Sequence, residues 1–278
     1  MVRGMQPTRP PLVMGIVNVT PDSFSDGGRF LGREAALAHG RRLVAEGADI
    51  LDVGGESTRP GSEPVSEAEE LARVVPVIEA LAAETDRPIS IDTAKPAVAR
   101  AAVAAGARIW NDVTALRGAP DSLEVAAELG CEVVLMHMQG EPRTMQAEPR
   151  YDDVVREVAD FLAARAEAAM AAGVGREKIW LDPGVGFGKH MTRHNLPLMG
   201  RLSEIVALGF PVLLGASRKS FISALDPAAR GSDERLGGSL AAAIAGAASG
   251  VAAVRVHDVR ETVQALKVWD AIAQAGAA

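Results

Sequence analysis

The sequence predicts a (β/α)8 barrel, an α/β fold in which a closed ring of eight parallel strands alternates with eight surrounding helices. Short apolar runs rich in branched residues recur along the chain, and amphipathic, alanine-rich segments with helical spacing separate most of them. The chain has 278 residues, close to the ~250 that are typical of this fold. No linker or change in composition divides it, which indicates a single domain. An open, doubly wound sheet is the main alternative, although it usually has fewer strands or a second domain.

The expected strands and helices alternate from residue 12 onward. The apolar runs that we expect to form strands begin near residues 12, 48, 88, 107, 132, 178, 211 and 252. The segments that we expect to form helices are residues 33–46, 66–84, 95–105, 121–129, 152–172, 195–208, 233–248 and 258–274. Ser66 and Glu69 fit a capping box at the start of the second helix. Residues 1–11 are rich in arginine, glycine and proline, so we expect a loose tail before a barrel domain over residues 12–278.

Composition excludes several classes of function. A net charge of −7 argues against nucleic acid or an anionic membrane as the main partner. No apolar run reaches the ~18 residues of a membrane span, and residues 1–11 lack the apolar centre of a signal peptide. The single cysteine, Cys131, cannot form an internal disulfide, which fits a cytoplasmic location. Because Cys131 comes just before an apolar run, we interpret it as a small buried residue rather than a nucleophile.

Polar residues gather where the expected strands end. The second strand passes directly into a polar loop with tight turns, Gly54-Gly55-Glu56-Ser57-Thr58-Arg59-Pro60-Gly61. In a barrel the carboxyl ends of the strands meet at one rim, where the active site lies. The side chains expected at this rim include Asn18, Asp92, Asn111, Asp182, Lys219, Arg255 and His257.

Asp92, Asn111 and Asp182 follow three different strands and are expected to share one cavity. Two carboxylates and an amide can recognise the N–H and NH₂ donors of an amino-pyrimidinone ring. The alternative for each residue alone is that it caps the helix that follows.

Cationic side chains follow the seventh and eighth strands, where barrels commonly bind phosphate. Arg218, Lys219, Arg255 and His257 suit a diphosphate group. The alternatives are ion pairs with acids such as Asp258 for Arg255, and a packed imidazole for His257.

Two glycine-containing loops lie near this rim. The run from Asp182 to Lys189 resembles a phosphate-binding loop, but it lacks the Gly-x-x-x-x-Gly-Lys-Ser/Thr pattern, so a nucleotide site is a weak interpretation. Phe187 within it would form an aromatic wall or simply fill the barrel mouth. Residues 20–28 have the composition of a lid, and Phe24 there needs a partner.

Six motifs together resemble the dihydropteroate synthase family over nearly the whole chain. They are Asn18-Val-Thr-Pro-Asp-Ser-Phe-Ser-Asp26, Asp52-Val-Gly-Gly-Glu-Ser-Thr-Arg-Pro-Gly61, Ser90-Ile-Asp-Thr93, Asp182-Pro-Gly-Val-Gly-Phe-Gly-Lys189, Ser217-Arg-Lys-Ser-Phe221 and Arg255-Val-His-Asp258. One departure is an apparent extra residue between His190 and Arg193.

The resemblance implies a transferase of folate synthesis, in which 4-aminobenzoate displaces pyrophosphate from 6-hydroxymethyl-7,8-dihydropterin diphosphate. It implies that the pterin is bound by Asp92, Asn111, Asp182 and Lys219. It places the aminobenzoate against Phe24, Thr58, Arg59, Pro60, Phe187, Lys219 and Ser220. Arg255 and His257 would bind the diphosphate, and Asn18 would hold Mg²⁺ on it. The residues expected to act in catalysis are Asp26, Asp92, Lys219 and Arg255.

The resemblance also implies a homodimer, for which apolar residues of the last two helices could form the face: Leu236, Leu240, Ile244, Val263, Leu266 and Trp269. Two other functions compete with the synthase reaction. A methyltetrahydrofolate:corrinoid methyltransferase would not need the Ser57–Pro60 and Ser217–Ser220 runs. A non-catalytic pterin-binding protein would be favoured by losses at Asn18, Arg59 or Lys219, and all three are present.

Overall fold

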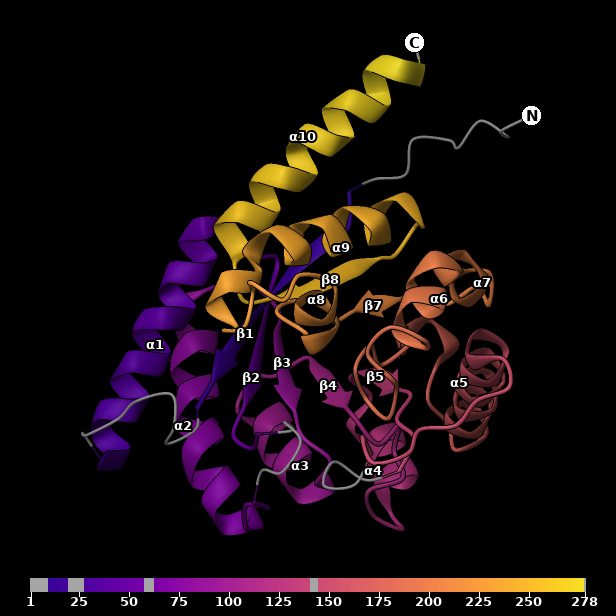
Figure 1. Ribbon diagram of the computed structural model, residues 1–278. Helices are drawn as coiled ribbons and strands as arrows, with labels where there is room; N and C mark the ends of the chain where they lie inside the picture. Colours follow the sequence, from indigo (N-terminus) through magenta and orange to yellow (C-terminus); the bar gives the residue numbers. More distant parts are fainter. Residues whose placement is uncertain (1–9, 20–27, 58–62, 141–144, 278) are drawn as a thin grey trace.

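Eight parallel strands form the centre of the molecule and helices cover the outside (Figure 1). The computed structural model describes residues 10–19, 28–57, 63–140 and 145–277. The strands are β1 (Leu12–Asn18), β2 (Ile50–Gly54), β3 (Ile89–Asp92), β4 (Ile109–Asp112), β5 (Glu132–Met136), β6 (Ile179–Asp182), β7 (Leu213–Leu214) and β8 (Ala253–Val256). Their order in the sheet is β6-β5-β4-β3-β2-β1-β8-β7. A parallel bridge between Leu181 and Val212 joins β6 to the segment before β7 and closes the ring, so the predicted barrel is confirmed.

The helices are α1 (Gly28–Glu46), α2 (Glu67–Glu84), α3 (Pro96–Ala104), α4 (Ser122–Leu129), α5 (Val154–Ala171), α6 (Asn195–Gly200), α7 (Leu202–Val206), α8 (Ser220–Leu225), α9 (Leu236–Ala248) and α10 (Val259–Ala277), with short 3-10 turns η2 (Arg176–Lys178) and η3 (Asp233–Arg235). None of the helices described is both long and apolar enough to cross a membrane. The tail predicted for residues 1–11 lies almost wholly outside the described residues and stays a prediction.

Three helical details differ from the sequence-based expectation. The helix predicted over residues 195–208 is broken at Arg201, whose backbone leaves the helical region (φ −113°, ψ 23°). Helix α8 was not predicted, because its six residues are too few to show a periodic pattern. At the start of α2, Ser66 Oγ accepts the N–H of Glu69 (3.3 Å), but the Glu69 carboxylate binds Arg73 (2.5 Å) rather than completing the capping box.

Side chains inside the barrel form an apolar layer beneath a polar one. The apolar layer consists of Met14, Ile50, Ile109, Val134, Leu213 and Ala253, with Trp180 packed against them. Because side chains alternate between the two faces of a strand, the residue two positions further along faces inward again. On β2, β4, β6 and β8 those residues are Asp52, Asn111, Asp182 and Arg255. The apolar layer therefore closes the floor of a polar chamber.

Helices α9 and α10 cover the β8 side of the barrel, and α10 extends past it in Figure 1. Leu266 is buried, so this member of the predicted dimer face covers the barrel instead. Further along α10, Val268 and Ile272 are 55% and 67% exposed.

Candidate active site

A cavity of about 950 Å³ opens at the carboxyl ends of the strands. Its lining includes nine of the residues predicted from the sequence: Asn18, Asp92, Asn111, Asp182, Phe187, Lys219, Ser220, Arg255 and His257. Phe24, Asp26, Thr58, Arg59 and Pro60 lie outside the described residues, so their roles stay predictions. Side chains that are far apart in the sequence thus share one site.

Arg255 bridges two carboxylates at the base of this cavity. Its Nε donates to Asp52 Oδ2 (2.5 Å) and its Nη2 donates to Asp92 Oδ2 (2.7 Å). Asn111 Nδ2 also donates to Asp52 Oδ2 (3.3 Å). The ion pair with Asp258 that we considered for Arg255 is instead made by Arg218, at 3.0 and 2.5 Å. Asp52 was missed as a site residue, although an acid within a buried apolar run is itself a signal that a cation must lie nearby.

Burial raises the pKa values of two acids in the site. Desolvation raises the pKa of Asp92 to about 7, although Arg255 opposes this effect. Desolvation also raises the pKa of Asp182, opposed chiefly by the N–H of Gly184, which donates to Asp182 Oδ1 (2.7 Å). Among the described residues, the Oδ1 atoms of Asp52 and Asp92 are buried without a hydrogen-bond partner. Asp92 thus has an oxygen that an incoming donor can satisfy.

Lys189 points into its own loop rather than toward a phosphate. Its side chain is fully buried, and Nζ donates to His137 Nδ1 (2.8 Å) and to the carbonyl oxygens of Gly184 and Phe187 (both 3.0 Å). Desolvation lowers the pKa of Lys189 to about 7. The lysine therefore holds the glycine loop together, which excludes it as a nucleotide-binding lysine of the kind considered from the sequence.

The glycine loop places Phe187 beside Lys219. The Lys219 Nζ lies 4.1 Å from the centre of the Phe187 ring, a cation–π contact at the cavity wall. Gly186 N donates to Asn195 Oδ1 (2.9 Å), and the Tyr151 hydroxyl donates to Gly188 O (2.8 Å). These bonds fix the aromatic wall from outside the cavity.

We expect Gly184→Ala to unfold or severely destabilise the site. The backbone of Gly184 has φ +65°, and a Cβ there would lie 1.9 Å from His137 O. Left-handed strain and overlap with a backbone atom should together lower the free energy of unfolding by more than ~3 kcal/mol. Denaturant unfolding measures the loss. The matched control is Gly237→Ala in α9, where no atom lies within 4 Å of the new Cβ and stability should hold or rise. Equal stabilities for the two variants would contradict the strain argument.

A strained turn presents the residues that follow β7. Arg218 has φ +57°, its N–H donates to Ser239 Oγ (2.9 Å), and its carbonyl accepts from Arg235 Nη1 (2.9 Å). These bonds hold the turn that carries Lys219 into the cavity.

His257 follows β8 and shares a hydrogen bond with Ser217, whose Oγ lies 3.1 Å from His257 Nδ1. Burial, followed by the charges of Arg255 and Arg218, lowers the pKa of His257 to about 3. The imidazole is therefore neutral near pH 7. If Ser217 donates to Nδ1, the Nε2–H is left as a donor.

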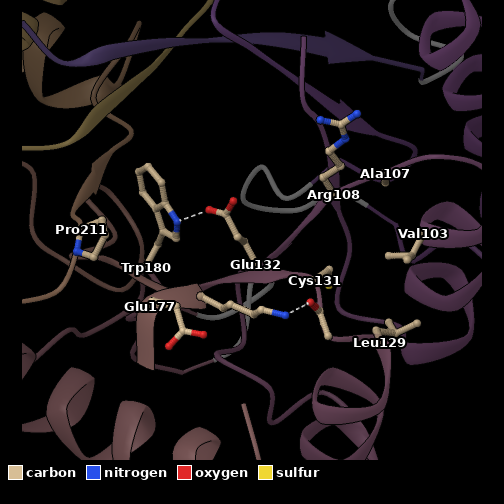
Figure 2. Close-up of a pocket in the computed structure, with 11 residues that line it drawn as sticks. Val103, Ala107, Arg108, Leu129, Cys131, Glu132, Glu177, Trp180 and Pro211 are labelled. Atoms are coloured by element: carbon tan, nitrogen blue, oxygen red, sulfur yellow. Dashed lines mark hydrogen bonds between the residues drawn. The ribbon is translucent and has the colours of Figure 1, made fainter. Parts of the chain in front are cut away.

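A second cavity, of about 550 Å³, lies at the opposite end of the barrel (Figure 2). Trp180 Nε1 donates to Glu132 (2.5 Å) there, and Lys178 donates to the carbonyl of Gly130. Cys131 lines it, is 8% exposed, and has its pKa raised by burial, as expected for a packed thiol. It contains none of the predicted site residues, which leaves the cavity at the carboxyl ends as the candidate active site.

Comparisons with known proteins agree with this geometry. Residues 14–257 match the model of a family described as pterin binding enzyme. The chain is 50% identical to the dihydropteroate synthase of Escherichia coli K12, over 94% of this chain and 91% of the other. A Xanthomonas albilineans dihydropteroate synthase solved with 4-aminobenzoic acid is 53% identical, with a TM-score of 0.89 and coverage of 94% and 93%. The same organism's enzyme solved with 7,8-dihydropteroate is 50% identical, with a TM-score of 0.86 and coverage of 96% and 95%. Because about half of its residues are identical to these proteins across nearly its whole length, the chain belongs to the dihydropteroate synthase family of pterin-binding transferases.

Proposed function

We propose that the protein joins 4-aminobenzoate to 6-hydroxymethyl-7,8-dihydropterin diphosphate, releasing pyrophosphate, in the cavity at the carboxyl ends of the strands. The observation that carries the proposal is the gathering of Asp92, Asn111, Asp182, Lys219 and Arg255 on that one cavity. The complexes of the Xanthomonas albilineans relatives with 4-aminobenzoic acid and 7,8-dihydropteroate support it.

The three polar residues at the base would bind the pterin as hydrogen-bond acceptors. Asp92 has Oδ1 left for a ligand, and Asp182 has Oδ2 left beside its bond to Gly184. Asn111 donates its amide N–H to Asp52, which turns its carbonyl oxygen away from Asp52 and makes it available as an acceptor. Three acceptors match the ring N–H and amino donors of a dihydropterin. Lys219 would donate to a ring acceptor.

Arg255 and His257 would bind the departing diphosphate. Arg255 uses one N–H each of Nε and Nη2 for its carboxylates, so other guanidinium N–H groups can reach a phosphate oxygen. His257 would donate through its neutral imidazole, held by Ser217. Both donors would stabilise negative charge that grows on the leaving oxygen, while Asp92 offsets positive charge on the pterin.

The residues present fit a magnesium ion that arrives with the diphosphate. Asn18 ends β1 at the cavity, and its amide makes no side-chain hydrogen bond within the described part of the chain. An amide oxygen is a ligand of the kind that Mg²⁺ accepts beside phosphate oxygens. The described residues contain no group of three acids, histidines or cysteines that would hold a metal alone. When bound, the ion would withdraw charge from the diphosphate.

The amine of 4-aminobenzoate is already a nucleophile, so the site needs no strong base. Phe187, Lys219 and Ser220 would form one side of the aminobenzoate pocket, where they line the cavity. The decisive experiment measures pyrophosphate release with both substrates and with each alone. Release that depends on both supports the synthase reaction. If no pyrophosphate is released under any of these conditions and the pterin still binds tightly, a non-catalytic pterin-binding protein would be favoured instead.

We expect pterin binding to weaken as the pH falls below about 7. A pterin donor needs ionised Asp92, and protonation of this acid, whose pKa is about 7, competes with binding. The dissociation constant of 6-hydroxymethylpterin, measured by calorimetry, should rise up to about tenfold per pH unit below that value. This ligand avoids titration of the diphosphate. Asp92→Asn should remove the dependence. If pterin binding to Asp92→Asn still depends on pH, the titrating acid would be Asp182 instead, whose pKa is also raised.

A homodimer and a cytoplasmic location complete the proposal. The exposed Val268 and Ile272 of α10 extend the apolar face that the sequence predicts on the last two helices. Light scattering of the purified chain tests the dimer, and a monomer at all concentrations would contradict it.

A further inference from the structure

A partly buried charge network links the residues that follow β2 to those that follow β3. The Nζ of Lys95 donates to Glu56 and, at 2.5 Å, to Glu70 Oε2. Glu70 lies on α2 with its side chain fully buried, while Glu56 and Lys95 are 28% and 26% exposed. Burial disfavours the charge of Lys95, but its bonds to Glu56 and Glu70 raise its pKa above the ordinary value. The lysine is therefore charged and shared between two acids.

Glu56 lines the active-site cavity and contacts both sides of the segment that it begins. Its Oε1 accepts the N–H of Val65 (3.3 Å), and its Oε2 accepts from Lys95. The next residue, Ser57, also lines the cavity. A single carboxylate thus connects residue 56, residue 65 and the turn after β3.

The backbone beside Glu56 is held equally closely. Arg73 Nη1 donates to Gly55 O (2.7 Å), and a Cβ at Gly55 would lie 2.7 Å from Val74 Cγ1 and 3.0 Å from Glu70 Cγ. At the other end of the network, the N–H of Lys95 donates to Thr93 Oγ1 (3.2 Å), directly after Asp92. Through Lys95, the position of Glu56 is therefore fixed relative to the end of β3, which carries Asp92.

We propose that Lys95 is a positioning residue for the second substrate: through Glu56 it holds the cavity wall at Ser57 in a fixed place relative to Asp92. The inference rests on the proposed synthase function. Lys95 itself would not touch either substrate. Ser57 directly precedes Thr58–Pro60, to which the family resemblance assigns the aminobenzoate, so we expect the loss of Lys95 to weaken aminobenzoate binding. The acceptors proposed for the pterin should stay in place, since Asp92, Asn111 and Asp182 are bonded to other residues. Small displacements of such a wall are costly for a bound nucleophile.

The test compares Lys95→Met with Glu56→Gln and Lys95→Arg in steady-state kinetics with both substrates varied. Lys95→Met should raise the KM for 4-aminobenzoate about tenfold or more and change the KM for the pterin diphosphate less than about twofold. Glu56→Gln keeps the buried Lys95–Glu70 pair, so it should fold and show the same split. Lys95→Arg, which can bind two carboxylates, should restore most of the lost affinity.

Lys178→Met is the matched control, because Lys178 also binds a protein oxygen but lines the cavity at the opposite end of the barrel, just before β6. It should leave both KM values unchanged. A fall in melting temperature with both KM values unchanged, or an equal rise in both, would overturn the positioning role. The proposed function fails separately, if the parent chain itself shows no pyrophosphate release that requires both substrates.

Discussion

Replacing Lys219 by alanine will lower turnover by about 10²- to 10³-fold while the barrel stays folded. Lys219 precedes α8 and its Nζ lies at the cavity wall, 4.1 Å from the centre of the Phe187 ring. Because we propose that its ammonium group contacts both substrates, the cost should appear mainly in kcat and in pterin affinity. The side chain is only partly buried, so thermal unfolding should change little.

Two variants make this result specific. Lys267→Ala removes an exposed lysine of α10 and should leave turnover unchanged. Lys219→Arg keeps the charge but not the compact ammonium geometry, and it should recover only part of the activity. An alanine variant at position 219 that turns over at the parent rate would remove Lys219 from the proposed site.

The barrel could be predicted because its physical causes are local. Buried parallel strands appear as apolar runs, and the helices between them show a 3.6-residue pattern. The alternation that points Met14 and Ile50 into the barrel also points Asp52, two residues after Ile50, into it. The strand sequences therefore predict a polar layer above an apolar floor. The rim follows from the shared direction of the strands.

What the sequence could not supply is pairing over long separations. Arg255 binds Asp52 and Asp92, which lie 203 and 163 residues away in the chain. No local pattern distinguishes these partners from the neighbouring Asp258. Nor could the sequence show that Lys189 turns away from the cavity, since that depends on two carbonyls of its own folded loop and on His137, which is 52 residues away in the chain.

Replacing Arg255 by leucine will cost about 3–5 kcal/mol of unfolding free energy and nearly abolish turnover. The variant leaves Asp52, which is fully buried, and Asp92, which is 11% exposed, without their shared cation. Because Arg255 opposes the raised pKa of Asp92 in the parent chain, Asp92 should then hold its proton to higher pH. The native variant would bind more protons than its unfolded state, so its stability should fall further behind that of the parent as the pH rises from about 6 to 8.5.

Arg201→Leu provides a matched control for this effect. Arg201 also bonds two carboxylates, Glu204 at 2.7 Å and Asp153 at 3.0 Å, but its side chain is 43% exposed. Water can solvate the acids that it leaves, so its unfolding curve should stay close to that of the parent chain. If Arg201→Leu lost much unfolding free energy and Arg255→Leu lost little, burial of the acids would not be the cause of the destabilisation.

The double variant Asp52→Asn/Arg255→Leu separates stability from catalysis. Removing the carboxylate of Asp52 removes one of the two uncompensated buried charges, so part of the lost unfolding free energy should return. Turnover should not return, because the guanidinium proposed to bind the departing diphosphate is still missing. Recovery of both together would mean that Arg255 only stabilises the barrel, and diphosphate binding would then have to rest on His257 and Lys219.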